Sequence, residues 1–166
     1  LVIMAGGPKE AFDAALPTFD AMGATVRHTG PTGTGTTVKL VNQLLVGIHS
    51  LAAAEAMLMG AKSGADPALV YELVSSGWGQ SFMLDRNAPV MLDQTYDDAR
   101  APLRTILKDL GLIQELARSI GAPTPAGDLA YKVFTQAAEA GLGDLDTSVV
   151  VKLLEKEAGV KVQRKS

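Results

Sequence analysis

The chain has 166 residues, of which 47% are apolar and 20% are charged, and its formal net charge is −3. This balance is typical of a globular chain, and it includes no basic stripe of the kind that binds nucleic acid. The sequence contains no cysteine, which excludes disulfides and thiolate chemistry, so we expect a cytoplasmic protein.

Residues 1–29 predict a small β-α-β piece. "LVIMAGG" is a short apolar run that ends in two glycines, and Pro8 suits the start of a helix that ends near Met22. "TVRHTG" alternates and contains β-branched residues, which favours a second strand. Two strands are too few to bury both faces of a sheet, and the sequence does not begin with methionine. We therefore expect the remaining strands upstream, in a longer protein.

From Thr36 the apolar period becomes helical and predicts one long helix that ends at Ser63, before Gly64. Its expected apolar stripe consists of Val38, Val41, Leu44, Leu45, Ile48, Leu51 and Ala52. This run comes closest to the roughly 18 uncharged residues that span a bilayer. Polar side chains interrupt it at His49, Ser50 and Glu55, so we expect no membrane partner.

The rest of the chain predicts further helices separated by glycine and proline. The expected helices are 67–76 after the capping Asp66, a short helix closed by Pro89, 103–120, 125–140 and 147–158, followed by a solvated tail at 161–166. The predicted fold class is therefore mostly α. Residues 1–29 would be the remnant of a larger domain with a β-sheet, and residues 30–166 a helical domain.

The chemistry-bearing residues lie where the glycine-rich loop meets the long helix. Gly30, Gly33 and Gly35 let the backbone approach a ligand, and the free amides at the helix start favour a substrate carboxylate there. Lys39 would then lie close to that carboxylate and act as a general acid or base. Asn42 and Gln43 follow three and four residues later, on the same helical face. The same residues also fit a plain glycine hinge followed by an exposed lysine.

The stretch from "GGPKEAFDAALPTFDAMGATVRHTG" to "PTGTGTTVKLVNQLLVGIHSLAAAEAMLMGAKSG" resembles the β-hydroxyacid dehydrogenase family, which includes 3-hydroxyisobutyrate dehydrogenase. The shared features are the glycine loop, the lysine at the start of a long helix, "AEAM" within that helix, and "KDL" at residues 108–110. They occur in register over nearly the whole chain. The pattern is most similar to that of the L-threonate dehydrogenase-like members.

The resemblance implies a role for each matching residue. Lys39 takes the place of the catalytic lysine, which relays the proton of the substrate hydroxyl while hydride goes to the nicotinamide. Asn42 and Gln43 would hold the substrate, although most relatives have asparagine where this chain has Gln43. Phe82 falls where relatives place a tryptophan that lines the substrate pocket, with core packing as the alternative. Lys108 matches the lysine of "KDL" that reaches the cofactor.

The same resemblance implies NAD or NADP as cofactor and a small hydroxyacid as substrate. It further implies a fold like that of the C-terminal domain of 6-phosphogluconate dehydrogenase, assembly into a homo-oligomer through the helical domain, and a partner in the protein's own N-terminal Rossmann domain. The Gly-x-Gly-x-x-Gly loop of that domain is not found in these 166 residues, so we expect this chain alone to be inactive.

Two other functions stay open. One is an enzyme of the 6-phosphogluconate dehydrogenase type. That branch has histidine at the position of Asn42, which argues against this alternative. The other is a non-catalytic helical oligomerisation module. His28 and His49 have no carboxylate at ligand spacing, so we expect no metal site. We expect Glu55 to be a buried or partly buried structural carboxylate, and Trp78 to be exposed or covered by a partner.

Overall fold

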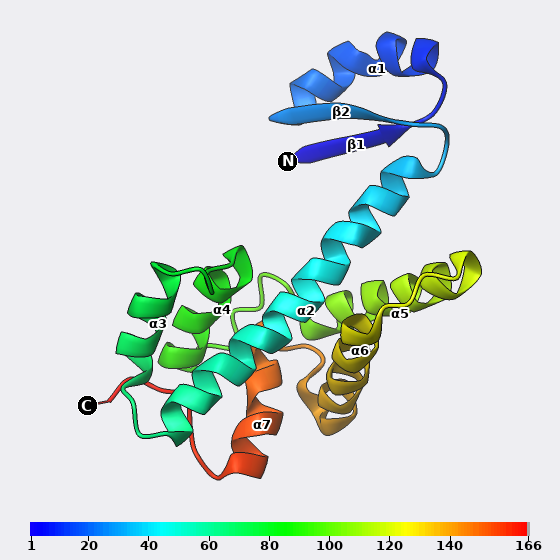
Figure 1. The fold of residues 1–166 in the computed structure, drawn as a ribbon. Coiled ribbons are helices and arrows are strands. Elements are labelled where there is room, and N and C mark those ends of the chain that lie inside the picture. Colours follow the sequence, from blue (N-terminus) through cyan, green and yellow to red (C-terminus); the bar gives the residue numbers. More distant parts are fainter. Residues whose placement is uncertain (166) are drawn as a thin grey trace. The chain divides into compact units, whose positions relative to one another are not determined.

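The computed structural model describes residues 1–165 as two compact units, and the elements of both are labelled in Figure 1. The first unit is Leu1–Gln43 and the second begins at Leu44, so their boundary lies inside helix α2 (Thr34–Lys62). The mostly α fold class predicted from the sequence is confirmed, because helices outnumber the two described strands.

The first unit contains the predicted β-α-β piece. Strands β1 (Val2–Gly6) and β2 (Thr25–Gly30) pair in parallel, with Val2 opposite Thr25 and a register shift after Ala5. Helix α1 (Lys9–Met22) connects them and lies across one face of this small sheet (Figure 1). The Phe12 ring packs against His28 of β2 at 5.0 Å between centroids. Both strands therefore end on the same side, where the glycine loop begins.

Helix α2 runs over 29 residues, as the periodicity predicts, but of the predicted stripe only Leu51 is buried, with Leu44 and Ile48 half-buried. The buried apolar residues are Leu40, Leu51, Ala53, Ala54 and Met57, whereas Val38, Val41 and Leu45 are 43%, 54% and 49% exposed. The buried face therefore combines two small alanines with three long apolar side chains, and other long apolar residues are left outside. Glu55 is also exposed, so its prediction as a buried carboxylate is wrong.

By length and composition, α2 is the one helix among residues 1–165 that could cross a membrane, and the expectation of no membrane partner stays a prediction. Its most apolar window is only 33% buried within the chain. Buried helices of water-soluble proteins pass the same test of length and composition, so the test alone does not assign α2 to a bilayer. What the structure does establish is a helix with a large uncovered apolar surface.

Helices α3 (Pro67–Ser75) and α4 (Phe82–Asp93) begin with side-chain caps. The carboxylate of Asp66 accepts a hydrogen bond from the amide of Ala68 at 3.1 Å, as predicted. The hydroxyl of Ser81 caps α4 in the same way. Pro89 does not close α4, which continues for a further turn. The proline removes one backbone hydrogen bond, and burial of its neighbour Ala88 holds the helix together.

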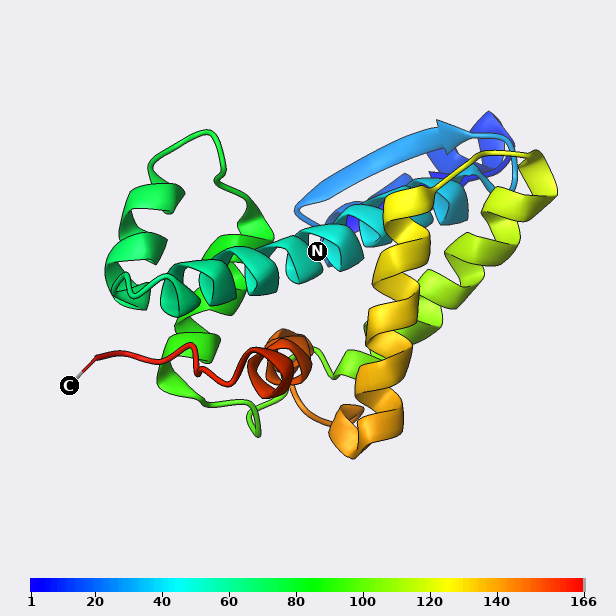
Figure 2. The same cartoon turned by 60° about the horizontal axis from the view of Figure 1, so that its bottom comes forward.

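The second half of the second unit is built around a buried 3₁₀ turn, η2 (Thr147–Val150). Helices α5 (Leu103–Ile120) and α6 (Pro125–Ala137) form a hairpin, which Figures 1 and 2 both show, and α6 continues into the π-turn η1 (Ala138–Leu142). The turn η2 contacts α4, α5, α6 and the final helix α7 (Val151–Ala158). All four of its residues are buried, so it is the point where these helices meet.

The C-terminal segment is packed against the second unit, so its prediction as a solvated tail is wrong for Val162. The Val162 side chain is fully buried, and its amide donates to the Glu155 carboxylate at 2.7 Å. Its carbonyl accepts from the Gln94 amide at 2.8 Å, and Arg164 pairs with Asp93. An alternating apolar and polar pattern as short as "VKVQRK" gives no period that distinguishes a docked strap from a solvated tail.

Candidate functional site

The glycine loop and the start of α2 lie within the first unit. Gly33, at φ 97°, adopts a backbone conformation that favours glycine, and it is exposed just before α2 begins. The hydroxyl of Thr34 donates to the carbonyl of Pro31 at 2.7 Å and lies 2.9 Å from the hydroxyl of Thr29. These contacts tie the loop to the end of β2 and fix the point at which the helix starts.

Lys39 is exposed on the second turn of α2. In the part of the chain that the structure describes, its amine forms no hydrogen bond or ion pair. Asn42 and Gln43 follow on the same side of the helix, where the Asn42 amide donates to the Gln43 side-chain carbonyl at 3.1 Å. The structure thus brings the predicted lysine and its two amides together on one helical face, with the lysine available to a ligand.

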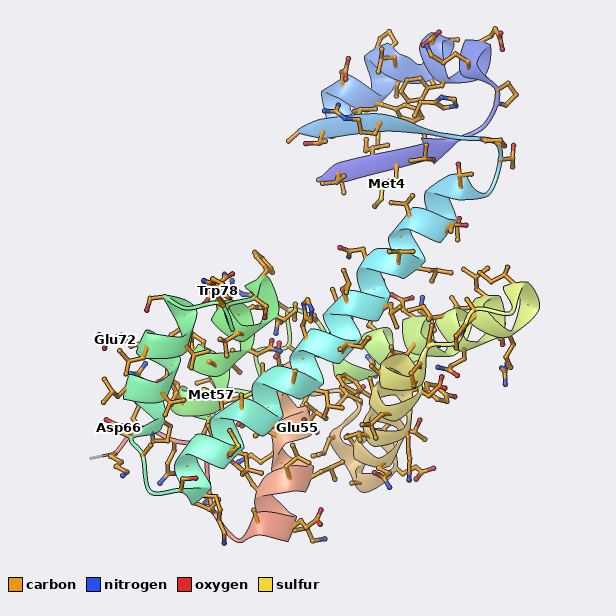
Figure 3. The ribbon with its side chains drawn as sticks, viewed as in Figure 1. Met4, Glu55, Met57, Asp66, Glu72 and Trp78 are labelled. Atoms are coloured by element: carbon orange, nitrogen blue, oxygen red, sulfur yellow. The ribbon has the colours of Figure 1, made fainter. Side chains whose placement is uncertain are left out.

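Gly35 is used differently from what the sequence predicts. We expected the loop glycines to admit a ligand, but Gly35 is buried against the end of β1. A Cβ atom built on Gly35 would overlap the Met4 carbonyl oxygen and lie 3.2 Å from the Gly6 amide nitrogen. Figure 3 labels Met4, whose strand lies beside the start of α2. The bare backbone at Gly35 therefore serves contact between helix and strand.

A shallow pocket of about 410 Å³ lies where the two parallel strands end. It is lined by Gly7, Pro8, His28, Gly30, Pro31 and Thr32. The His28 Nε2 atom lies 2.7 Å from the Gly7 carbonyl, and the Gly7 amide donates to the Gly30 carbonyl at 2.8 Å. Ligands of open α/β sheets bind outside the carboxyl ends of the strands, which is where this pocket lies.

The other two predicted site residues, Phe82 and Lys108, belong to the second unit. Phe82 is the first residue of α4 and is 80% exposed, so the core-packing alternative is wrong for this chain. Lys108 is exposed on α5, and its amine lies 2.9 Å from a carboxylate oxygen of the buried Asp109. Asp109 was not singled out from the sequence, although its place in "KDL" next to Lys108 was the available signal.

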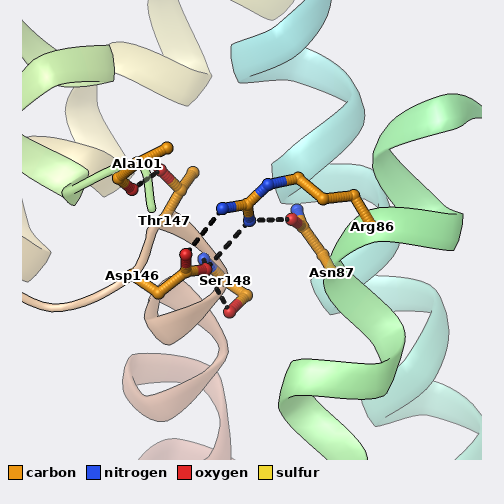
Figure 4. A network of polar contacts seen from close by, with 6 residues as sticks. All are labelled: Arg86, Asn87, Ala101, Asp146, Thr147 and Ser148. Atoms are coloured by element: carbon orange, nitrogen blue, oxygen red, sulfur yellow. Dashed lines mark hydrogen bonds and ion pairs between the residues drawn. The ribbon is translucent and has the colours of Figure 1, made fainter. Parts of the chain in front are cut away.

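The second unit also contains a buried polar network that the sequence did not indicate (Figure 4). The two terminal guanidinium nitrogens of Arg86, Nη1 and Nη2, donate to the carboxylate of Asp146 at 2.9 and 2.6 Å. Asp146 also accepts from the amide and the hydroxyl of Ser148, and Arg86 donates to Asn87. Asp146 thereby caps η2 and holds α4 to it, so we assign the network to structure.

The pKa values of this pair are set by burial and by their mutual contact. Burial raises the pKa of the Asp146 carboxyl, but the hydrogen bonds from Arg86 and Ser148 outweigh it and hold that pKa below its ordinary value. The hydrogen bond to Asp146 raises the pKa of Arg86. Both groups therefore stay charged. Among residues 1–165, no group of three histidine, aspartate or glutamate side chains is placed to hold a metal ion.

The comparisons with known proteins agree with this geometry. Residues 33–154 match the family model described as the NAD-binding domain of NADP-dependent 3-hydroxyisobutyrate dehydrogenase. The chain therefore belongs to this family, and the β-hydroxyacid dehydrogenase resemblance seen in the sequence is confirmed.

Individual relatives are also named as dehydrogenases. L-threonate dehydrogenase of Haemophilus influenzae is 36% identical over 99% of this chain and 54% of its own length. NAD-dependent L-serine dehydrogenase of Pseudomonas aeruginosa is 32% identical over 96% of this chain and 55% of its own length. A solved 3-hydroxyisobutyrate dehydrogenase from Salmonella typhimurium superposes with a TM-score of 0.85 at 36% identity, covering 90% of this chain and 53% of that one. The chain thus spans about half the length of these relatives.

Proposed function

We propose that the protein containing this chain is an NAD(P)-dependent oxidoreductase that acts on a small β-hydroxyacid. The observation that carries this proposal is the exposed Lys39 amine, which has no ion pair or hydrogen bond among residues 1–165. It follows a glycine turn, and the amides of Asn42 and Gln43 lie one helical turn further. Membership of the 3-hydroxyisobutyrate dehydrogenase family supports the reaction class. The substrate is a hydroxyacid of three or four carbons, of the 3-hydroxyisobutyrate, threonate or tartronate-semialdehyde type.

In the proposed reaction, the residues of this chain move a proton and orient the substrate. Lys39 takes the hydroxyl proton as the carbon–hydrogen bond of the same carbon breaks, and the alcohol becomes a carbonyl. A nicotinamide cofactor, when bound, would supply the acceptor for the hydride. Asn42 and Gln43 orient the substrate through hydrogen bonds, and the amides that follow Gly33 at the start of α2 favour its carboxylate. In the reverse direction the protonated lysine returns the proton to the alkoxide oxygen.

The cofactor is NAD or NADP in this proposal, and two parts of the protein hold it. A Rossmann domain that precedes this chain would bind the dinucleotide, since the two-stranded sheet of the first unit is completed only by further strands. Lys108 is the residue of this chain that we assign to the cofactor. Its amine is exposed and can reach a phosphate, which would compete with the Asp109 carboxylate 2.9 Å away.

We also propose that the protein forms a homo-oligomer through its helices. Val38, Val41 and Leu45 are spaced three and four residues apart on α2, and each is between 43% and 54% exposed. A row of uncovered aliphatic side chains on a helix is the usual mark of a surface that another chain covers. This surface suits a second copy of α2, because apolar rows on two equivalent helices are self-complementary.

The experiment that tests the enzymatic proposal compares Lys39 variants of the full-length protein with wild type. We expect Lys39→Ala to lower kcat at least 10²-fold, the contribution typical of a general acid or base. Lys39→Arg keeps the positive charge but not a group able to lose its proton, so we expect it to be nearly as slow. Lys132→Ala, on the exposed surface of α6, is the matched control and should retain activity. A fully active Lys39→Ala enzyme would overturn the proposal.

A further inference from the structure

We propose that Gly35 and Gly6 are positioning residues for Lys39, because their contact without side chains seats the first turn of α2 on the end of β1. The inference rests on the proposed role of Lys39 and extends it to two residues that touch neither substrate nor cofactor. All the residues concerned lie in the first unit, Leu1–Gln43.

The contact is formed by backbone on both sides. A Cβ atom on Gly35 would overlap the Met4 carbonyl oxygen and lie 3.1 Å from its carbon. A Cβ atom on Gly6 would lie 2.7 Å from the carbonyl oxygen of Pro31 and 2.8 Å from the Thr34 hydroxyl. A flexible side chain could rotate away from such an overlap, but the backbone carbonyl of Met4 lies within β1 and can move only with the strand. A methyl group at position 35 would therefore push α2 away from β1.

The position of Lys39 follows from that of Gly35. The two residues are four apart on α2, so they lie on the same side of the helix, one turn apart. Side chains of a helix lean toward its N-terminus, which directs the Lys39 side chain back over the turn that contains Gly35. That turn rests on the end of β1. The amine is therefore aimed at the strand ends, the edge of the sheet that also carries the shallow pocket lined by Gly7 and Gly30.

This arrangement makes the distance between helix and strand a determinant of the rate. A shift of about 1 Å in the placement of a reacting group costs about 10²-fold in rate, even when the mutation lies away from the chemistry. We expect Gly35→Ala to lower kcat about 10²-fold. The change in KM should be smaller, because the groups that bind the substrate ground state are kept. The pH profile of kcat should also shift, because the amine then sits in a changed environment.

The matched control is Gly47→Ala, on the same helix. A Cβ atom on Gly47 would lie 2.8 Å from Cδ2 of Leu110, the mobile tip of a side chain, and two turns separate Gly47 from Lys39. In the full-length protein we expect Gly47→Ala to lower thermal stability but to keep kcat and its pH profile. Gly6→Ala disturbs the same contact from the strand side. Its Cβ atom would overlap its neighbours less than the one at Gly35, so we expect a smaller loss of kcat. It decides the question if Gly35→Ala does not fold.

The outcomes separate this inference from the proposed function. A fully active Lys39→Ala enzyme removes the proposed function and this inference with it. An inactive Lys39→Ala enzyme together with a Gly35→Ala enzyme whose kcat stays within about threefold of wild type (under 1 kcal/mol) overturns the inference alone. Equal losses of kcat in Gly35→Ala and Gly47→Ala would also overturn it, because the effect would then be one of stability. A loss confined to Gly35→Ala and Gly6→Ala supports it.

Discussion

Lys39 and Asp146 show two different uses of a charged side chain in this protein. Lys39 is exposed and forms no ion pair among the described residues, which leaves its charge available to a ligand. Asp146 is buried, with 2% of its surface exposed, and both of its carboxylate oxygens are bonded to Arg86 or Ser148. Because Asp146 is buried and both of its oxygens are held by structural donors, we assign it to stability.

Replacing Asp146 by asparagine should therefore destabilise the protein without touching the proposed site. Arg86 would be left partly buried without its counter-charge, and breaking one partner of such a pair costs about 3–5 kcal/mol. We expect the loss of unfolding free energy to lie near the lower end of this range, because Arg86 remains partly exposed. Urea unfolding at neutral pH measures it. Asp144→Asn, which removes an exposed partner of Arg104, is the control and should change stability by less than about 0.5 kcal/mol.

The same pair predicts how stability depends on pH. The pKa of Asp146 is lowered in the folded state, so as pH falls the unfolded chain takes up its proton first. The contribution of Asp146 is fully present above the ordinary aspartate value of about 4, and it is lost as pH drops toward the folded-state pKa. Urea titrations from about pH 6 to about pH 3 should show a steeper loss in wild type than in Asp146→Asn. Parallel curves for the two proteins would contradict this account.

Single residues were predictable from the sequence where a motif fixed their place. Lys39, Asn42 and Gln43 were selected by the glycine loop before them and by family resemblance, and the structure brings them together on one face. Burial was less predictable. Glu55 follows an inward alanine but is exposed, and Asp109 follows an exposed lysine but is buried. Which side of a helix is covered depends on its tertiary neighbours, and these cannot be deduced from local spacing.

At the scale of elements, the helix boundaries were predicted best where caps mark them. Asp66 before Pro67 begins α3 and Gly121 follows the end of α5, because side-chain caps and glycines act locally. Pro89 misled the prediction because a proline only disfavours a continuing helix, and burial on both sides of it kept α4 intact. The docked C-terminal segment could not be predicted either, since its partners Gln94 and Glu155 are distant in sequence.

The docked segment provides a test at this scale. We expect Val162→Ala to destabilise the protein by about 2 kcal/mol, since two buried methyl groups are lost and a small cavity is left behind. Thermal or urea unfolding measures the change. Gln163→Ala, at the exposed neighbouring position, is the matched control and should have almost no effect. A Val162→Ala protein as stable as the control would show that the segment is not fastened in solution.

The hydrogen bonds around this segment explain why it docks. Lys152 contacts the Gln94 side-chain oxygen, pairs with Glu155 at 3.3 Å, and lies over the Tyr96 ring. Burial, with the nearby Glu155 carboxylate, raises the pKa of Tyr96, so its hydroxyl stays protonated. The fixed charges and donors around Gln94 and Glu155 hold the two backbone groups of Val162, which would otherwise be buried without partners.

At the scale of the whole molecule, the proposed oligomer makes a prediction that does not depend on activity. We expect Leu45→Glu to weaken self-association at least tenfold, because it places a charge in an apolar interface. Leu129→Glu is the control, since Leu129 is 52% exposed on α6 and Leu45 is 49% exposed on α2. Light scattering over a concentration series gives the mass of each. Equal masses for both variants and wild type would contradict an interface at α2.

Trp78 gives this protein its own optical reporter. It is the single tryptophan in the chain, it lies between two glycines after α3, and its side chain is fully exposed (Figure 3). Its fluorescence should accordingly peak at the long wavelengths of a water-solvated indole and be quenched freely by iodide. Any molecule that covers the loop would shift the emission to the blue and protect it from the quencher. Assembly and ligand closure at this loop are thus readable by spectroscopy without attaching a dye.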